Sequence, residues 1–337
     1  MKNKYIIPIF VPHRGCNNMC VFCNQRKISG QIEDLTAKQV DNIISEYLNK
    51  NANVDYTKIQ VAFYGGSFTG IEKEKQIEFL EVANKYILSK QIDSIRLSTR
   101  PDYINEDILT YLKEYGVKTI ELGVQSLKEE VLKASKRGHN IQVVEYASNL
   151  IKEYGFELGL QMMIGLPCSN EQYEYDTAKE IIKLKPKIVR IYPTLVIKDT
   201  ELAQMYEQGK YIPYTLEKSI EICAKLLKCF ENHDINVIRV GLQTTDNINE
   251  GKDVVAGPFH PSFGELVRQR IIRNDIENKL QGKKNISIKI ECNNKDISKI
   301  VGNSKSNITY FKEKYGAIIK LEVNNNLKQG EYIIKDE

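Results

Sequence analysis

Apolar runs typical of strands alternate with amphipathic stretches typical of helices along most of this 337-residue chain. In the amphipathic stretches, such as Lys73–Leu88 and Glu217–His233, apolar residues recur every three to four positions. This alternation predicts βα units around a parallel sheet. Six or seven units fit an α/β fold with an incomplete or distorted barrel. The predicted strands are Tyr5–Val11, Ile59–Tyr64, Ser94–Ser98, Thr119–Gly123, Leu158–Ile164, Val189–Leu195 and Val237–Val240.

A second, smaller domain is expected at the C-terminal end. The basic amphipathic stretch Glu265–Leu280 is followed by a polar linker, so we place the first domain at residues 1–280 and the second at 281–337. From Lys283 to Glu337 there are eleven lysines and seven acidic residues, so this segment carries the whole net charge of +4. Such a segment suggests a polyanionic partner, although a solvated lysine-rich surface gives the same count.

Three cysteines, Cys16, Cys20 and Cys23, follow the first predicted strand with the spacing C-x3-C-x2-C. One short loop can therefore bring three thiolates to three irons of a [4Fe–4S] cube and leave the fourth iron open to another ligand. His13 offers an alternative, because H-x2-C-x3-C-x2-C could close a structural zinc site. The cluster is favoured because the loop lies at the C-terminal end of a strand, where α/β barrels place their chemistry.

The remaining cysteines and the N-terminus indicate the compartment. Seven cysteines are too few for a disulfide scaffold in a chain of this length, and clustered thiols suit a reducing compartment. The first apolar stretch is short and interrupted by Pro8 and Pro12, which predicts neither a signal peptide nor a membrane span. We expect a cytoplasmic protein without a membrane partner. Buried thiols are expected at Cys168, Cys223, Cys229 and Cys292.

The second and third predicted strands end in residues that could contact a ligand. Gly65 and Gly66 end the second strand, and without a Cβ their backbone can approach a ligand closely. A tight turn is the alternative explanation, since Gly-Gly is a common turn dipeptide. Ser98 begins a polar stretch, Ser98–Tyr103, at the same edge of the sheet.

The fourth and fifth strands end similarly. Gln125 could hydrogen-bond a ribose hydroxyl, and the planar guanidinium of Arg137 suits a carboxylate. A strand-end cap and a surface ion pair are the structural alternatives for these two residues. Gly165 follows the fifth strand and would allow the edge of a base to approach.

Together these residues resemble the radical S-adenosylmethionine (SAM) superfamily. The resemblance rests on the cysteine triplet, on Tyr64-Gly-Gly-Ser-Phe68, and on Glu121-Leu-Gly-Val-Gln-Ser126 with Arg137-Gly-His139. More narrowly, the chain is similar to the radical SAM module of the elongator catalytic subunit, a tRNA-modifying enzyme. This similarity runs from about Tyr5 to Arg270 and includes the stretches Ser98–Tyr103, Ile191–Ile197, Tyr211–Thr215 and Gly257–Glu265.

The resemblance implies a partial (β/α)6-type radical SAM barrel in which Cys16, Cys20 and Cys23 hold a [4Fe–4S] cluster. It also implies that the reduced cluster cleaves SAM to a 5′-deoxyadenosyl radical, with electrons from a donor such as flavodoxin or ferredoxin. Similarity to coproporphyrinogen dehydrogenases places Gln161 where those enzymes have an aspartate at the ribose. No catalytic side chain is assigned. The implied SAM contacts are Gly65, Gly66, Ser98, Gln125, Arg137, Gln161 and Gly165.

Two departures from the elongator pattern limit what the resemblance implies. Elongator subunits have a longer gap between their first two cluster cysteines. They also continue into an acetyltransferase domain, whereas this sequence ends soon after the expected barrel. Carboxymethyluridine synthesis by the same chemistry is therefore not expected unless another protein supplies the acetyl donor.

The C-terminal segment is similar to a minimal KH-like RNA-binding unit. We expect strands at Ile286–Cys292 and Ile318–Val323, with a short helix Ile297–Ile300 and a second helix ending at Tyr315. KH units clamp RNA with a G-x-x-G loop between two helices, but here Lys305 stands where the second glycine would be. A small structural cap is the alternative. If the segment binds RNA, the contacts are expected at Lys299, Gly302, Lys305 and Lys312.

Three functions are compatible with these features. The leading one is a radical SAM enzyme that modifies a nucleoside in tRNA or rRNA. The second is a radical SAM enzyme acting on a small metabolite or tetrapyrrole, with the C-terminal domain as a cap. The third is a non-catalytic zinc or iron–sulfur protein that binds RNA. The atom modified, any second substrate and the oligomeric state are not predicted.

Overall fold

A computed structural model describes residues 4–11, 16, 19–24, 35–50, 58–242, 252–280 and 283–336. The chain divides into two compact units, Met1–Leu216 with Cys229–Phe259, and Glu217–Lys228 with His260–Glu337. Helix α9 (Leu216–Glu231) contributes residues to both. The expected domain boundary at residue 281 stays a prediction.

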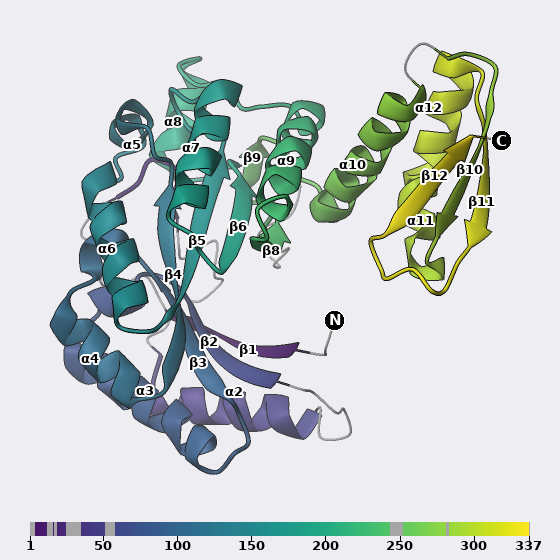
Figure 1. The fold of residues 1–337 in the computed structure, drawn as a ribbon. Coiled ribbons are helices and arrows are strands. Elements are labelled where there is room, and N and C mark those ends of the chain that lie inside the picture. Colours follow the sequence, from purple (N-terminus) through teal and green to yellow (C-terminus); the bar gives the residue numbers. More distant parts are fainter. Residues whose placement is uncertain are drawn as a thin grey trace. The chain divides into compact units, whose positions relative to one another are not determined.

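The first unit is built on a seven-stranded parallel sheet in the order β1-β2-β3-β4-β5-β6-β8. Each strand pairs in parallel with the next one along the chain, apart from the short β7. Figure 1 shows this sheet as a curved half-barrel, which confirms the predicted α/β fold. The strands are β1 (Lys4–Val11), β2 (Lys58–Gly65), β3 (Ser94–Thr99), β4 (Val117–Gln125), β5 (Glu157–Ile164), β6 (Ile188–Pro193) and β8 (Asn236–Val240).

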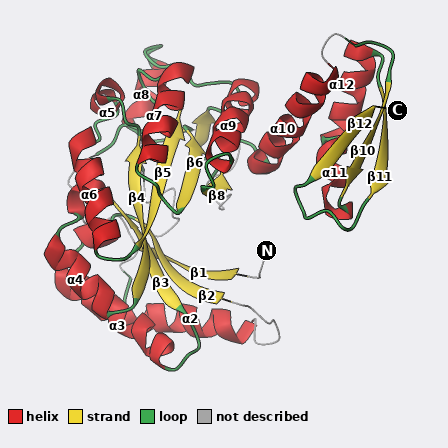
Figure 2. Cartoon of the chain, viewed as in Figure 1, coloured by secondary structure: helices red, strands yellow, loops and turns green. Residues whose placement is uncertain are grey.

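Helices follow the strands and, as Figures 1 and 2 show, α3, α4, α6 and α7 lie along the outer side of the sheet. Three of them begin at an asparagine cap: Asn105, Asn140 and Asn170 each accept a hydrogen bond from the backbone N–H three residues further on. Such caps satisfy orphan N–H groups and fix where each helix starts. The helices are α2 (Ala37–Lys50), α3 (Lys73–Leu88), α4 (Glu106–Glu114), α5 (Glu129–Ala134), α6 (Ile141–Glu153), α7 (Glu171–Lys183) and α8 (Glu201–Glu207).

Side chains on β4 alternate between two environments. Ile120 and Leu122 are fully buried on one face, and Glu121 on the other face is also only 1% exposed. Two arginines neutralise this carboxylate: Arg96 Nη1 donates to it over 3.1 Å, and Arg190 Nε over 2.5 Å. The interior of the half-barrel therefore contains a buried ion-pair network rather than an apolar core.

Glycine creates the space for this network. A Cβ on Gly159 of β5 would lie 2.8 Å from Cγ of Glu121 and 2.9 Å from Ile188. Arg190 continues the network by donating to the hydroxyl of Tyr64 over 2.7 Å, and Arg96 donates to the side-chain oxygen of Gln60 over 2.9 Å.

The chain leaves the sheet after β6 and forms a small antiparallel pair, β7 (Val196–Ile197) with β9 (Val254–Ala256). The sequence predicted one strand through Leu195, whereas β6 ends at Pro193. Thr194 explains the turn, because its N–H and its hydroxyl both donate to the carbonyl of Ile164, over 2.9 and 2.7 Å.

The second unit contains a three-stranded sheet in the order β11-β10-β12. Strand β10 is parallel to β11 and antiparallel to β12, and β12 was not anticipated from the sequence. The small α+β domain is confirmed, and its core includes Ile276 of α10 with Ile290 and Phe311. None of the helices in the described part of the chain has the length and apolar character of a membrane span. The elements are α10 (Phe263–Leu280), β10 (Ser287–Cys292), α11 (Ile297–Val301), α12 (Ser306–Tyr315), β11 (Ile318–Val323) and β12 (Tyr332–Asp336).

Candidate functional site

The cysteine loop, residues Cys16 to Cys23, meets two of the predicted strand ends. Cys16 Sγ lies 3.2 Å from the hydroxyl oxygen of Ser67, the residue after the Gly65–Gly66 pair. Cys20 Sγ lies 3.1 Å from Nη1 of Arg137, although the two residues are 117 positions apart in the chain. The fold thus brings the first cysteines, the glycine turn and Arg137 to one place at the C-terminal edge of the sheet.

Two buried guanidiniums lie beside Cys20. Arg137 is 5% exposed and Arg100 3% exposed, and Arg100 Nη1 is 4.0 Å from Cys20 Sγ. Asp102 holds Arg100 through two hydrogen bonds of 2.9 Å. Burial opposes the charged form of Arg100, but the Asp102 carboxylate keeps its pKa above the usual value. Arg100, which the sequence did not single out, thereby supplies a second fixed positive charge beside a predicted iron ligand.

Arg137 is not in the surface ion pair considered from the sequence. It is buried, and it pairs with no carboxylate among the described residues. Its Nη2 donates to the carbonyl of Gly123, and its own carbonyl accepts from Arg100. Nε of Arg137 is buried without a hydrogen-bond partner in the part of the chain that the structure describes. One donor of this guanidinium is therefore left for a ligand.

Gly65 is required by the packing of β2 against β1. It adopts φ +101°, and a Cβ there would lie 2.5 Å from the carbonyl oxygen of Val11. The N–H of Gly66 donates to the same oxygen over 3.2 Å. The glycine pair is therefore held against the end of β1, where the chain enters the cysteine loop.

Gln125, the last residue of β4, carries two signs of a binding site. Its φ is +68°, a left-handed conformation that a residue with a side chain rarely adopts and that often marks a functional position. Its Oε1 is buried and lacks a hydrogen-bond donor among the described residues. A buried acceptor without a partner costs free energy unless a ligand donates to it.

Three other predicted contacts have partners inside the protein. Gln161 Nε2 donates to Glu121 over 3.2 Å, so this side chain belongs to the buried ion-pair network. Ser98 Oγ is 3.5 Å from the carbonyl oxygen of Phe63. The ring of Tyr214 lies on the Cβ side of Gly165, 3.1 Å from where a Cβ would be. The structure adds Tyr214 to this turn, which spacing along the sequence did not reveal.

His139, from the Arg137-Gly-His139 stretch, is neutral at pH 7. Burial lowers its pKa to about 4, and the positive charges of Arg137 and Arg100 act in the same direction. It therefore adds no third cation beside the cysteine loop.

The three thiol side chains of the cysteine loop are the kind of donor set that an iron–sulfur cluster needs. No three His, Cys, Asp or Glu side chains among the described residues converge closely enough for a single metal ion. A four-iron cube does not need such convergence, because each thiolate binds a different iron. The zinc alternative depends on His13, which lies outside the described residues.

The other four cysteines were expected to be buried. Cys223 and Cys292 are buried as predicted, and Cys229 is half-buried. The prediction for Cys168 was wrong, because this residue lies in an exposed turn.

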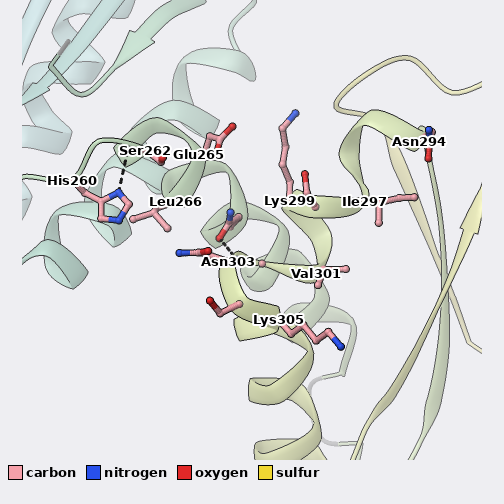
Figure 3. Close-up of a pocket in the computed structure, with 14 residues that line it drawn as sticks. His260, Ser262, Glu265, Leu266, Asn294, Ile297, Lys299, Val301, Asn303 and Lys305 are labelled. Atoms are coloured by element: carbon pink, nitrogen blue, oxygen red, sulfur yellow. Dashed lines mark hydrogen bonds between the residues drawn. The ribbon is translucent and has the colours of Figure 1, made fainter. Parts of the chain in front are cut away.

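Lys299, Gly302 and Lys305 line one pocket of about 740 Å³ in the second unit (Figure 3), and Lys312 is not part of its lining. Lys299 is paired with Asp296 over 2.7 Å, whereas Lys305 is exposed and has no ion pair among the described residues. In Figure 3 the side chains of Lys299 and Lys305 extend in different directions.

Left-handed backbone shapes the loop between α11 and α12. Gly302, Ser304 and Lys305 have φ of +82°, +51° and +63°. Gln269 of α10 fixes the loop by accepting a hydrogen bond from the N–H of Asn303 over 3.0 Å. This N–H is therefore not free to contact RNA in the way the G-x-x-G resemblance implies.

Comparison with known families identifies the chain. Residues 10–181 match the model of the radical SAM superfamily, and residues 186–273 match the radical SAM C-terminal domain. The protein belongs to the radical SAM superfamily and is a radical SAM enzyme.

Its relatives include tRNA uridine(34) acetyltransferase of Methanocaldococcus jannaschii, 29% identical over 63% of this chain and 46% of that protein. Elongator complex protein 3 of Saccharomyces cerevisiae is 27% identical over 50% of this chain and 34% of the yeast protein. The solved structure of Methanocaldococcus infernus Elp3 has the same fold, with a TM-score of 0.66 at 24% identity, covering 82% of this chain and 64% of that one. The resemblance to elongator radical SAM modules is confirmed, and the chain spans less than half the length of these two curated relatives.

Proposed function

We propose that this radical SAM enzyme modifies a nucleoside in tRNA or rRNA. The observation that carries the proposal is that three of the four residues expected to bind RNA line one pocket. This pocket is in the second unit, which contains the lysine-rich segment from Lys283 to Glu337. The relatives add support, because one is named a tRNA uridine(34) acetyltransferase. Action on a small metabolite or tetrapyrrole remains the alternative function.

In this proposal Cys16, Cys20 and Cys23 hold a [4Fe–4S] cluster, and the reductant is a flavodoxin or ferredoxin. Cluster and SAM together supply a 5′-deoxyadenosyl radical that abstracts a hydrogen atom from the substrate. Arg100 and Arg137 place positive charge beside Cys20, and charge and hydrogen bonding around a cluster tune its reduction potential.

SAM itself would contact the residues that end the neighbouring strands. The buried Oε1 of Gln125 suits a ribose hydroxyl, and the free N–H of Arg137 suits the methionine carboxylate. Gly65 and Gly66 would contact the methionine part of SAM. Ser98, Gln161 and Gly165 are proposed at the adenosine end, where their present hydrogen bonds would orient them.

Gln125→Gly should separate stability from SAM binding. Glycine adopts φ +68° without strain, so the free energy of unfolding should rise by about 1 kcal/mol. The affinity for SAM should fall by about 1–3 kcal/mol, since a buried hydrogen bond to the ligand is lost.

Arg137→Ala should weaken SAM binding by a similar amount without removing the cluster. Calorimetry with SAM and urea unfolding measure the two effects, and unchanged SAM affinity in both variants would show that these residues are only framework.

The second-unit pocket has a composition that suits an unpaired nucleotide. Its volume of about 740 Å³ is within the range of about 300–1,000 Å³ typical of small-ligand sites. Leu266, Ile297 and Val301 offer apolar surface to a base, and Ser298 and Asn303 offer hydrogen bonds. Lys305 lies at this pocket as an exposed cation that could pair with a phosphate.

Replacing Lys305 and Lys312 together by alanine should lower RNA affinity and its salt dependence. Each lost phosphate contact should remove about 0.7–0.9 from the log–log slope of affinity against salt. Lys299 is left intact because its removal would leave the carboxylate of Asp296, which is 1% exposed, without its ion-pair partner. The matched control is Lys328→Ala in the same unit. Titration of tRNA and rRNA fragments at several salt concentrations checks this, and identical curves for all three proteins would assign the unit to a structural cap.

The substrate class can be tested by turnover. Under reducing, oxygen-free conditions, tRNA or rRNA fragments should accelerate release of 5′-deoxyadenosine above the rate without substrate, since a bound substrate supplies the hydrogen atom that the radical abstracts. Acceleration by a tetrapyrrole or small metabolite, with no effect of RNA, would establish the alternative function.

A further inference from the structure

The backbone of the cysteine loop is clamped at Val21, the residue after Cys20. Its N–H donates to the carbonyl of Ser135, just after α5, over 3.2 Å. Its carbonyl accepts from the N–H of Leu202, in the first turn of α8, over 2.7 Å. Elements distant in the sequence therefore fix the stretch between two predicted iron ligands.

The Val21 side chain is buried in a small apolar cluster of its own. This cluster also contains Leu202 and Ala203 of α8, Val196 of β7, and Tyr211. Val21 is 1% exposed and Tyr211 is 7% exposed. The ring of Tyr211 thus belongs to the apolar packing that seats the cysteine loop.

The hydroxyl of Tyr211 reaches a different part of the site. It donates to the carbonyl oxygen of Gly165 over 2.6 Å. Burial raises the pKa of Tyr211, and the negative charge of Glu174 raises it further, so the phenol stays protonated and remains a donor. The N–H of Gly165 donates to Glu174 over 2.6 Å. Both backbone polar groups of Gly165 are therefore held by side chains.

We propose that Tyr211 is a positioning residue that sets the separation between the cysteine loop and the Gly165 turn. One side chain packs with the loop through its ring and holds the turn through its hydroxyl. This inference rests on the proposed function, which assigns the loop to the cluster and the turn to the adenosine of SAM. A ligand that must meet both is bound well only if their separation is fixed before it arrives.

Tyr211→Phe removes the hydroxyl and keeps the ring. The carbonyl of Gly165 would lose its donor, while the packing around Val21 would be retained. The dissociation constant for SAM should rise about tenfold. Iron and sulfide content, and the electron paramagnetic resonance spectrum of the reduced cluster without SAM, should match the wild type. Adding SAM should change that spectrum in the variant as in the wild type, but only at SAM concentrations about tenfold higher. Tyr206→Phe on α8, where the tyrosine is 38% exposed, is the control and should match the wild type in every measurement.

SAM affinity within twofold of the wild type in Tyr211→Phe would overturn the proposal, as would loss of iron in that variant. Failure of wild-type protein to bind SAM at all would instead overturn the proposed function.

A double-mutant cycle with Val21→Ala keeps the test valid if either single variant is less stable. If Tyr211 fixes the separation between the cysteine loop and the Gly165 turn, Val21→Ala and Tyr211→Phe disturb the same link. Their effects on SAM affinity should then be less than additive. Additive effects would show two independent contacts and would contradict the link.

Discussion

Alanine at Cys16, Cys20 or Cys23 should abolish both cluster assembly and reductive cleavage of SAM. Wild-type protein reconstituted without oxygen should bind about four irons per chain, and each cysteine is expected to hold one of them. With two thiolates left, the loop has too few ligands to retain the cube. Iron and sulfide analysis, together with the yield of 5′-deoxyadenosine after reduction, measures the loss.

Cys168→Ala is the matched control for these variants. Cys168 is exposed and lies in the turn after Gly165, outside the cysteine loop. Its replacement should therefore leave iron content and SAM cleavage unchanged. Stoichiometric zinc in reconstituted wild-type protein, with no absorbance in the visible region, would contradict the cluster assignment and favour the set that includes His13.

Glu121→Ala should lower the free energy of unfolding by about 3–5 kcal/mol. The carboxylate is 1% exposed and is bonded to Arg96 and Arg190, whose side chains are 8% and 10% exposed. Its removal would leave two buried guanidiniums without a counter-charge and would also remove the acceptor of Gln161. Urea unfolding of wild type and variant at equal cluster content measures the difference.

The comparison for Glu121 is Glu180→Ala on α7. Glu180 pairs with Lys183 over 2.7 Å, but the two side chains are 45% and 70% exposed. Solvent screens such a pair, and its loss should cost less than about 0.5 kcal/mol. If Glu121→Ala were as mild as Glu180→Ala, the network inside the half-barrel would not be needed for stability.

Much of the fold could be predicted because hydrophobic periodicity is a local property. Lys73–Leu88 is a helix with the predicted bounds, and β11 has the predicted limits Ile318–Val323. Strand β12 was missed because Tyr332–Asp336 pairs with β10, whose residues lie 40 to 48 positions earlier in the chain. The end of β6 was misplaced because the turn depends on hydrogen bonds from Thr194 to the neighbouring β5.

The candidate site was predictable where chemistry depends on residue type and spacing along the chain. The cysteine triplet and Arg137 were predicted as site residues in this way, and the fold brings Cys20 and Arg137 within 3.1 Å. Arg100 and Tyr211 lie in stretches named from the sequence, but their roles could not be predicted, because only the tertiary structure brings their partners close. Cys168 was wrongly expected to be buried, since its exposure follows from the turn after Gly165 and not from the composition around it.

The most direct test of the RNA-modifying function is mass spectrometry of nucleosides from total RNA. Cells with the intact gene would be compared with cells lacking it, and with the latter after complementation by wild type or by Cys20→Ala. The proposal predicts that one modified nucleoside disappears without the gene and returns with wild type but not with Cys20→Ala. Identical nucleoside profiles in all four would contradict it.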